Sequence, residues 1–333
     1  MSVDLQPLPV AVEPSDEESG LGFLLRCSHA NGIALQFLAN HAGVRSLRWM
    51  VPRDIDTLAY LAGVSPNWLG QRVKTRRQVN GRRQYSYLGW EWGSIASLRV
   101  KQPQVCPECL AEYAICRAEW DVAMISACPV HRALLIDRCP HCGMRLTWSR
   151  PAIDVCCCGR YLRRSGREHH LSRDEMSWCQ TLSARLKGKH LARAVEPPTI
   201  QLPEWIFHVS PDGASRLVHA LGALSKPGQC LSSAKVVEIP SPSELAEVVE
   251  RGLARGRMLQ EQSIEFRRSI RVLIYEPGLQ RLARQGVVFE DQQAAVQLMK
   301  FLDCESLDLV ERERRRGGRP TKGQLELFQD AGA

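Results

Sequence analysis

Residues 106–159 read CPECLAEYAICRAEWDVAMISACPVHRALLIDRCPHCGMRLTWSRPAIDVCCCG. This stretch contains four short pairs of Cys or His residues at the spacing typical of metal ligands. A C-x-x-C turn places two thiolates on one side of an ion, and zinc prefers four sulfur or nitrogen ligands in a tetrahedron. The sequence therefore predicts two structural zinc ions in a tandem zinc-knuckle platform over residues 106–165. The eight candidate ligands are Cys106, Cys109, Cys128, His131, Cys139, Cys142, Cys156 and Cys158.

The pairs can be combined into two sites in more than one way. The simplest assignment is sequential, with the first and second pairs around one ion and the third and fourth pairs around the other. An interleaved arrangement, with the first and third pairs sharing an ion, uses the same number of ligands. In the triplet Cys156–Cys158 the middle residue, Cys157, is left over in a C-x-C-G pairing, and it is the alternative ligand at that site.

Disulfides, a redox dithiol and a catalytic zinc site are the alternatives to structural zinc. Disulfides form in oxidising compartments, whereas the acidic, proline-containing first residues show no basic segment followed by an apolar one, as a secretory signal would. We therefore expect an intracellular protein with reduced thiols. A catalytic zinc keeps an open position and has three protein ligands, but each site here has four.

The composition predicts a globular chain without a membrane span. Of its 333 residues, 44% are apolar, and no apolar run approaches the 18 residues that a transmembrane helix needs. The formal net charge is +8. Residues 19–101 contain 12 Lys and Arg against three acidic residues, so this basic part is the expected contact for a polyanion.

Residues 54–73, DIDTLAYLAGVSPNWLGQRV, predict a helix-turn-helix. Ala59 is small where two helices would cross, and Gly63 follows at the turn. Ser65 is the expected cap of the second helix, and Pro66 suits its first turn. Leu69 and Val73 should face the core, so the opposite face of this helix is free for a partner.

Polar and basic residues on and after the second helix are the candidates for contact with nucleic acid or another partner. Side chains on such a helix reach phosphates and base edges when it lies in a major groove, and the basic run beyond it favours nucleic acid through counterion release. Helix-turn-helix units also serve for packing or protein docking, and that alternative stays open. The candidates are Asn67, Gln71, Arg72, Lys74, Arg76, Arg77, Arg82 and Arg83.

Two segments next to the zinc ligands have their own patterns. Tyr85, Tyr87, Trp90 and Trp92 alternate along the chain, which predicts a strand or extended arm whose aromatic rings pack in the core. Between the first two ligand pairs we expect a helix over residues 110–125, with Cys116 as a buried thiol.

The remaining sequence predicts a mainly α protein. An N-terminal helix-turn-helix region (19–105) precedes the zinc platform, and a C-terminal helical domain (199–310) follows a helix and linker (166–198). Residues 1–18 and 311–333 should be a disordered acidic tail and a basic flexible tail. The helices expected after the platform cover approximately 172–191, 212–224, 243–261, 264–274, 278–285 and 289–301, with Ser243 as one N-cap and a faint helix-turn-helix pattern over 283–299.

The knuckle sequence CPECLAE…W…ISACPVHRALLIDRCPHCGMRL…CxCG resembles the TniQ/TnsD family of transposon target-selection proteins, and GLGFLLRCSHANG near residue 20 resembles the N-terminal helices of that family. The resemblance covers about residues 19–165. It assigns Cys106, Cys109, Cys128 and His131 to one zinc site and Cys139, Cys142, Cys156 and Cys158 to the other. The Cys triplet departs from the plain C-x-C of the family.

This resemblance implies a non-catalytic adaptor of a Tn-type transposon. Such a protein links target recognition to an AAA+ ATPase and, indirectly, to the transposase. Target recognition is through an RNA-guided CRISPR Cascade effector or through attachment-site DNA. The moderate length favours the Cascade-associated group, whose members are often dimers. We expect a bacterial cytoplasmic protein that associates with the nucleoid.

Two other classes fit less well. A helix-turn-helix transcription regulator would have one dominant recognition element, which two mid-chain zinc sites do not suggest. A zinc hydrolase would need an open coordination position and a general base, and no H-E-x-x-H or comparable spacing occurs.

Overall fold

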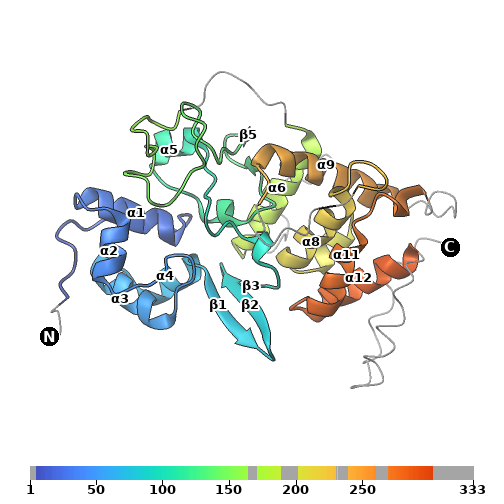
Figure 1. Ribbon diagram of the computed structural model, residues 1–333, viewed down its shortest axis with the longest axis horizontal. Coiled ribbons are helices and arrows are strands. Elements are labelled where there is room, and N and C mark those ends of the chain that lie inside the picture. The colour runs from blue at the N-terminus through green and yellow to red at the C-terminus, as the bar shows by residue number, and fades with distance from the viewer. Residues whose placement is uncertain are drawn as a thin grey trace. The chain divides into compact units, whose positions relative to one another are not determined.

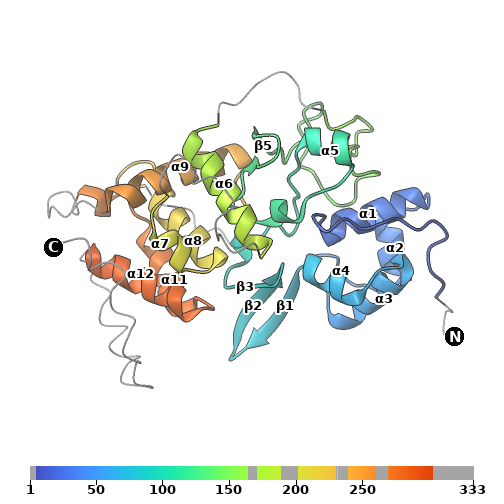
Figure 2. The same ribbon diagram turned by 180° about the vertical axis from the view of Figure 1, so that it is seen from behind.

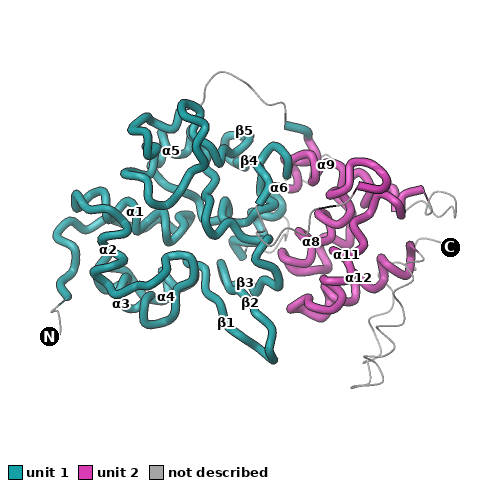
Figure 3. The backbone as a smooth tube through the Cα atoms, in the orientation of Figure 1, with its two compact units in different colours: residues 1–172, 179–192, 238–245 teal, residues 173–178, 193–237, 246–333 magenta. Residues whose placement is uncertain are grey.

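The structure is a computed structural model that describes residues 5–163, 171–188, 202–229, 231, 239–259 and 269–302. The chain divides into two compact units (Figure 3). The first consists of residues 1–172, 179–192 and 238–245, and the second of residues 173–178, 193–237 and 246–333. All the candidate metal and nucleic-acid residues belong to the first unit.

The described part of the chain is mainly helical, as the sequence predicts (Figure 1). Of the helices whose bounds the structure describes, five short ones lie in the first unit, two contribute residues to both units, and four lie in the second unit. In chain order they are α1 (Gly20–Ala30), α2 (Leu35–His41), α3 (Pro52–Ala62), α4 (Pro66–Arg72), α5 (Pro107–Tyr113), α6 (Arg173–Leu186), α7 (Trp205–His208), α8 (Pro211–Gly222), α9 (Pro242–Met258), α11 (Glu276–Gln285) and α12 (Phe289–Phe301).

The N-terminal segment is held against the first helices. The N–H of Leu8 donates to the carbonyl oxygen of Leu61 at 2.8 Å, and Glu18 is buried in an ion pair with Arg26 at 2.5 Å. The predicted disordered tail is therefore wrong for residues 5–18, because bonds to the folded helices fix this stretch. Residues 1–4 lie outside the described residues.

Two helices joined by a short turn, α3 and α4, form over the residues where the sequence predicts a helix-turn-helix. α3 ends at Gly63, whose φ of +70° is a left-handed conformation that glycine adopts without strain. Ser65 occupies the N-cap position of α4, but its side chain makes no capping hydrogen bond, so its expected capping role is not realised. Ala59 and Leu69 are buried in the core of this unit.

A three-stranded antiparallel sheet follows α4. Its strands, β1 (Thr75–Val79), β2 (Arg82–Tyr87) and β3 (Trp90–Trp92), are adjacent in that order. The two-residue turns between them have positive φ at Asn80 and Gly81 and at Leu88 and Gly89, which is the pattern of tight hairpins. The alternating aromatic residues predicted extended structure only for residues 85–92, although the Asn80-Gly81 pair is a strong hairpin signal.

The segment between the first two ligand pairs is mostly irregular. Ala114 ends α5 in a left-handed conformation, with a φ of 50°. A short 3₁₀ helix, η2 (Ala118–Asp121), and the two-residue strands β4 (Ala127–Cys128) and β5 (Ala133–Leu134) follow. The predicted helix over 110–125 is therefore wrong, because the chain must turn back to bring the second pair to the first. Cys116 is buried, as predicted.

The second unit contains α8, α11 and α12, which pack on one another. Near the end of α8, a Cβ on Gly222 would collide with the carbonyl oxygen of Val248 on α9, so glycine permits close contact between these helices. The expected helices over 212–224, 278–285 and 289–301 are present with small shifts at their ends.

Other helix predictions in the C-terminal half need correction or fall outside the described residues. α9 starts from a capping box of Ser241 and Glu244, so Ser241 and not Ser243 is the N-cap. α6 ends at Leu186, short of the predicted end near residue 191. Residues 261–268, most of the linker and the C-terminal basic tail lie outside the described residues.

Candidate metal centres and nucleic-acid interface

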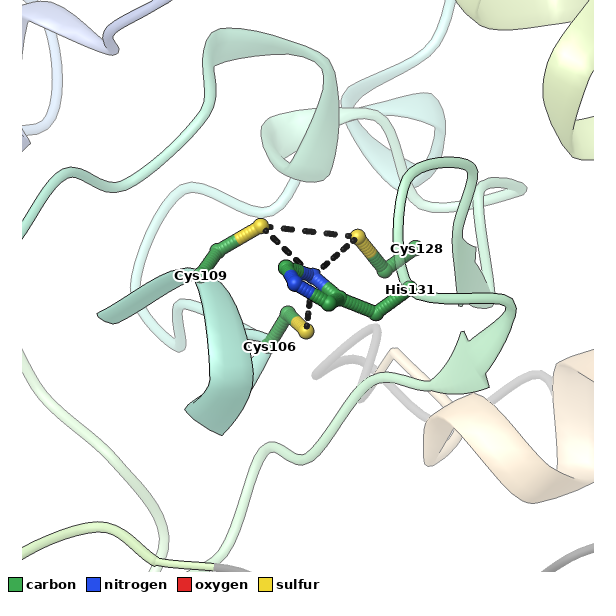
Figure 4. A group of neighbouring side chains, drawn as sticks. All are labelled: Cys106, Cys109, Cys128 and His131. Atoms are coloured by element: carbon green, nitrogen blue, oxygen red, sulfur yellow. Dashed lines mark hydrogen bonds between the residues drawn. The ribbon is translucent and has the colours of Figure 1, made fainter. Parts of the chain in front are cut away.

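The first cluster brings together Cys106, Cys109, Cys128 and His131. Cys106 precedes α5 and Cys109 lies in its first turn, whereas Cys128 ends β4 and His131 follows in the turn to β5. All four ligand atoms lie within 4.8 Å of one another. Figure 4 shows the three sulfur atoms grouped around the ring of His131. The fold thus brings the pair Cys106 and Cys109 next to the pair Cys128 and His131, so that all four ligand atoms surround one position.

The distances in this cluster fit a tetrahedral zinc ion. Zn–S bonds of about 2.3 Å and Zn–N bonds of about 2.0–2.1 Å give roughly 3.5–3.8 Å between ligand atoms in a tetrahedron. The Nδ1 atom of His131 lies 3.6 Å, 3.2 Å and 3.8 Å from the sulfurs of Cys106, Cys109 and Cys128, and the last two sulfurs are 3.6 Å apart. Four soft or borderline donors at these separations are suited to zinc in a closed structural site.

Glu112 is a supporting residue that the sequence analysis missed. Its Oε2 lies 2.9 Å from the Nε2 atom of His131, while Nδ1 of the same ring faces the sulfurs. A carboxylate that accepts from the outer ring N–H fixes the tautomer and orientation of a ligating histidine. Glu112 lies one helical turn after Cys109 on α5, and this spacing is the signal that could have identified it.

The thiols of the first cluster are close enough to share protons. Hydrogen bonds from Cys106 and Cys109 lower the pKa of Cys128 to about 2. The contacts of Cys106 with Cys109 and Cys128 raise the pKa of Cys106. The Cys128 thiolate is thus stabilised by the S–H groups of Cys106 and Cys109. A cation bound at the centre of the cluster would displace these protons and stabilise the thiolates itself.

The second cluster groups Cys139, Cys142, Cys156 and Cys158 within 4.8 Å. The sulfurs of Cys139 and Cys158 are 3.8 Å apart, and so are those of Cys142 and Cys156, which again matches the edge of a tetrahedron. Cys142 and Cys158 are exposed, whereas the other two are buried. The second cluster therefore lies closer to solvent than the first.

The structure groups the ligand atoms in the sequential arrangement and not in the interleaved one. Cys157 lies outside the second cluster: it is exposed, and its sulfur is 3.9 Å from the hydroxyl oxygen of Thr147. Within the cluster, burial raises the pKa of Cys139, but the backbone N–H groups of Cys142 and His141 outweigh it and lower this pKa to about 7. N–H groups that point at a sulfur are the usual second shell of a knuckle.

Among the candidate nucleic-acid residues, those on and next to α4 are in different environments. Asn67 and Gln71 are exposed on one face. Arg72 is half-buried: it stacks on the ring of Trp68 at 4.7 Å and donates to the backbone oxygen of Asp16 at 2.8 Å. Of the candidate residues on α4, Asn67 and Gln71 are therefore the two that are open to a partner.

The predicted exposure of Lys74 is wrong. Its ammonium group is buried 2.5 Å from the carboxylate of Asp121 and 5.0 Å from the centre of the Tyr87 ring. Burial lowers its pKa, and Asp121 opposes this effect. The reason is that Lys74 stands between α4 and β1, where the chain enters the core, so this side chain serves structure and cannot reach a phosphate.

The four arginines that follow lie on the β1–β2 hairpin. Arg76 and Arg77 are on β1, and Arg82 and Arg83 are on β2; all four are exposed. An open depression of about 380 Å³ lies beside α4 and is lined by Asp56, Asn67 and Gln71 among others. The α4 face therefore combines amides with a carboxylate, and the positive charge of this region is concentrated on the hairpin.

Comparison with known proteins identifies the N-terminal part of the chain. Residues 9–135 match the TniQ family. This N-terminal part of the chain is similar to the TniQ family. The match contains the helix-turn-helix, the sheet and the whole first cluster, but it ends before the second cluster. A search of curated proteins found no match.

A TniQ domain indicates a protein of transposition target selection. In the part of the chain that the structure describes, no helix has both the length and the apolar character to cross a membrane.

Proposed function

We propose that this TniQ protein is a non-catalytic target-selection adaptor of a Tn-type transposon. It would connect a target-recognition complex to an AAA+ ATPase, and through it to the transposase. The observation that supports this most directly is the TniQ match over residues 9–135. The matched segment includes the α3–α4 helix pair, the three-stranded sheet and the first metal cluster.

The two clusters are proposed as structural zinc sites. Cys106, Cys109, Cys128 and His131 would hold one ion, and Cys139, Cys142, Cys156 and Cys158 the other. Each set supplies four ligands, so no coordination position is left for water or substrate. When bound, the ions would fix the irregular segment between the ligand pairs, because structural zinc contributes its binding free energy to folding.

For the recognition complex we favour an RNA-guided CRISPR Cascade effector, with the adaptor acting as a homodimer in the bacterial cytoplasm and at the nucleoid. The alternative is direct reading of attachment-site DNA, which the four exposed arginines of the hairpin support. A transcription regulator of the helix-turn-helix class is the weaker third alternative.

Capture experiments distinguish these functions. The zinc-loaded full chain would be mixed with the Cascade effector and guide RNA from the same source, and separately with duplex DNA carrying the transposon attachment site. Stoichiometric capture by the effector supports the Cascade adaptor, whereas sequence-specific DNA binding without capture supports the attachment-site alternative. If the chain recruits the AAA+ ATPase in neither setting, the adaptor function is wrong.

A further inference from the structure

The β1–β2 hairpin carries charge of one sign only. Between Thr75 and Tyr87 the sequence has four arginines and no acidic residue. The hairpin extends from the helices of its own unit (Figure 1, Figure 2), and its turn residues, Asn80 and Gly81, are exposed. The hairpin is therefore a narrow cationic element with its tip in solvent.

The strand register divides the arginines between the two faces of the hairpin. Arg77 is opposite Gln84, and Val79 is opposite Arg82, so Arg77 and Arg82 share one face. Arg76 is opposite Tyr85, and Gln78 is opposite Arg83, which places these two arginines on the other face, because alternate residues point to opposite sides of a strand. A hairpin that lay flat on a polyanion would need its charges on one face. Here each face has a pair.

The base of the hairpin is fixed. Lys74, just before β1, forms the buried ion pair with Asp121, and its carbonyl oxygen accepts from the N–H of Met50 at 3.1 Å. The third strand pairs with β2, and Trp92 donates to the carbonyl oxygen of Tyr87 at 3.2 Å. The hairpin is thus a ribbon held at its root, which lowers the entropy cost of binding at its tip.

Arg76 and Arg77, the two arginines near the base of the hairpin, each make one contact and remain exposed. Arg76 lies 5.9 Å from the centre of the Trp49 ring. Arg77 pairs with Glu91 at 3.1 Å, but the Arg77 side chain is 58% exposed. Glu91 is 30% exposed, and surface pairs contribute about 0–1 kcal/mol, so a phosphate can compete with the carboxylate for Arg77.

We propose that the β1–β2 hairpin enters the major groove of target duplex DNA, with Arg76 and Arg83 facing one phosphate wall and Arg77 and Arg82 facing the other. The major groove of B-form DNA is about 12 Å wide and admits a two-stranded ribbon. The minor groove is about 6 Å wide, and proteins that bind there frequently kink the duplex. The deep and narrow major groove of A-form RNA excludes the ribbon. The inference rests on the proposed target-selection function, since it identifies the DNA surface that this function uses.

Fluorescence anisotropy of the zinc-loaded full chain with a labelled random-sequence duplex tests the proposal. Two double variants each remove the positive charge of one face of the hairpin. One is Arg76→Ala with Arg83→Ala, and the other is Arg77→Ala with Arg82→Ala. Each should weaken binding by roughly tenfold or more at 0.1 M salt and reduce the slope of log affinity against log salt by about 1.8, because each phosphate contact contributes about 0.9. The control, Arg45→Ala with Arg53→Ala, removes the same charge at exposed positions outside the hairpin and should change both quantities little.

Protection of guanine N7 from dimethyl sulfate identifies the groove, since N7 lies in the major groove. The wild type should protect it, and both face variants should lose that protection while they keep their zinc content and thermal midpoint. If only one face matters, if neither does, or if a minor-groove ligand competes for the site, the ribbon geometry is wrong. Tighter binding of duplex RNA with the same arginine dependence would also overturn it. If the face variants bind DNA as the wild type does, and the wild type still captures the effector and the ATPase, the ribbon alone is wrong and the adaptor function stands.

Discussion

The ammonium group of Lys74 lies 2.5 Å from the carboxylate of Asp121, and both side chains are buried. Lys74 stands at the root of β1, whereas Asp121 ends η2, in the segment that joins the two ligand pairs of the first cluster. The hydroxyl group of Tyr87 donates to the same carboxylate at 3.0 Å. This ion pair therefore connects the basic hairpin to the first metal cluster.

Removing one partner of this pair should be strongly destabilising. Lys74→Met leaves the carboxylate of Asp121 without its buried counter-charge, which costs about 3–5 kcal/mol. The double variant Lys74→Met with Asp121→Leu should recover most of this loss, because two apolar side chains replace two desolvated charges. The free energy of unfolding in urea is the measurement. Glu91→Gln, which breaks the partly exposed pair with Arg77, is the control, with an expected change of about 1 kcal/mol. Equal costs at the two sites would contradict the importance of the buried pair.

The number of zinc ions bound per chain should fall when a ligand residue is replaced and stay the same when a neighbouring cysteine outside the clusters is replaced. We expect two zinc ions per wild-type chain, one in Cys128→Ser, and two in Cys157→Ser, since the sulfur of Cys157 lies outside the second cluster. Cys128→Ser should also lose the fold around η2, because the ion would close that segment. Elemental analysis by mass spectrometry measures the stoichiometry. Two ions retained in Cys128→Ser would show that the first ligand set is wrong.

Glu112 should tune the zinc affinity of the first cluster through His131. Glu112→Ala removes the acceptor 2.9 Å from Nε2 of the ring, and loss of such a partner typically costs 10–100-fold in metal affinity. Glu112→Gln keeps an acceptor oxygen and should restore much of the affinity. Competition with a chromogenic chelator gives the constants, and Glu13→Ala, at an exposed position away from the cluster, is the control. If Glu112→Ala binds zinc as tightly as wild type, Glu112 does not position the ring.

Asp291 should make the stability of the second unit depend on pH. Its carboxylate accepts from the N–H of Ser210 at 2.7 Å and from the hydroxyl group of Ser210 at 2.6 Å, at the start of α8. Burial raises the pKa of Asp291 to about 6 from an ordinary value of 3.8. The folded state thus favours the protonated form, and this stabilisation is complete below the unfolded pKa and is lost as pH rises through 6.

Asp291→Asn removes this titration. The free energy of unfolding of the variant relative to wild type should therefore rise by about 3 kcal/mol between pH 4 and pH 7, at about 1.4 kcal/mol for each pH unit between the two pKa values. Chemical denaturation at several pH values provides the comparison. Glu290→Gln, which removes a charge from the exposed side of the same helix, is the matched control. Parallel profiles for wild type and Asp291→Asn would exclude the role of this carboxylate.

Local signals in the sequence were sufficient to predict the α3–α4 helix pair and to identify the metal-ligand pairs. Gly63 and the apolar positions of α3 and α4 act within a few residues, so they could be recognised without the fold. The same holds for the C-x-x-C turns, whose spacing alone indicates paired ligands. The β1–β2 hairpin was missed even though Asn80-Gly81 marks its turn, because the run of arginines around it was interpreted only as charge.

The sequence by itself determined which residues can be ligands, where the helix-turn-helix lies and where the arginines are concentrated, because each of these properties depends on neighbours along the chain. Only the tertiary structure decided that Lys74 is buried against Asp121, that Glu112 meets His131, that the ligand pairs combine sequentially and that the arginines are divided between two faces of a ribbon. These are contacts between residues distant in sequence or across strands, and their geometry is set by how the chain turns back on itself, which no local pattern records.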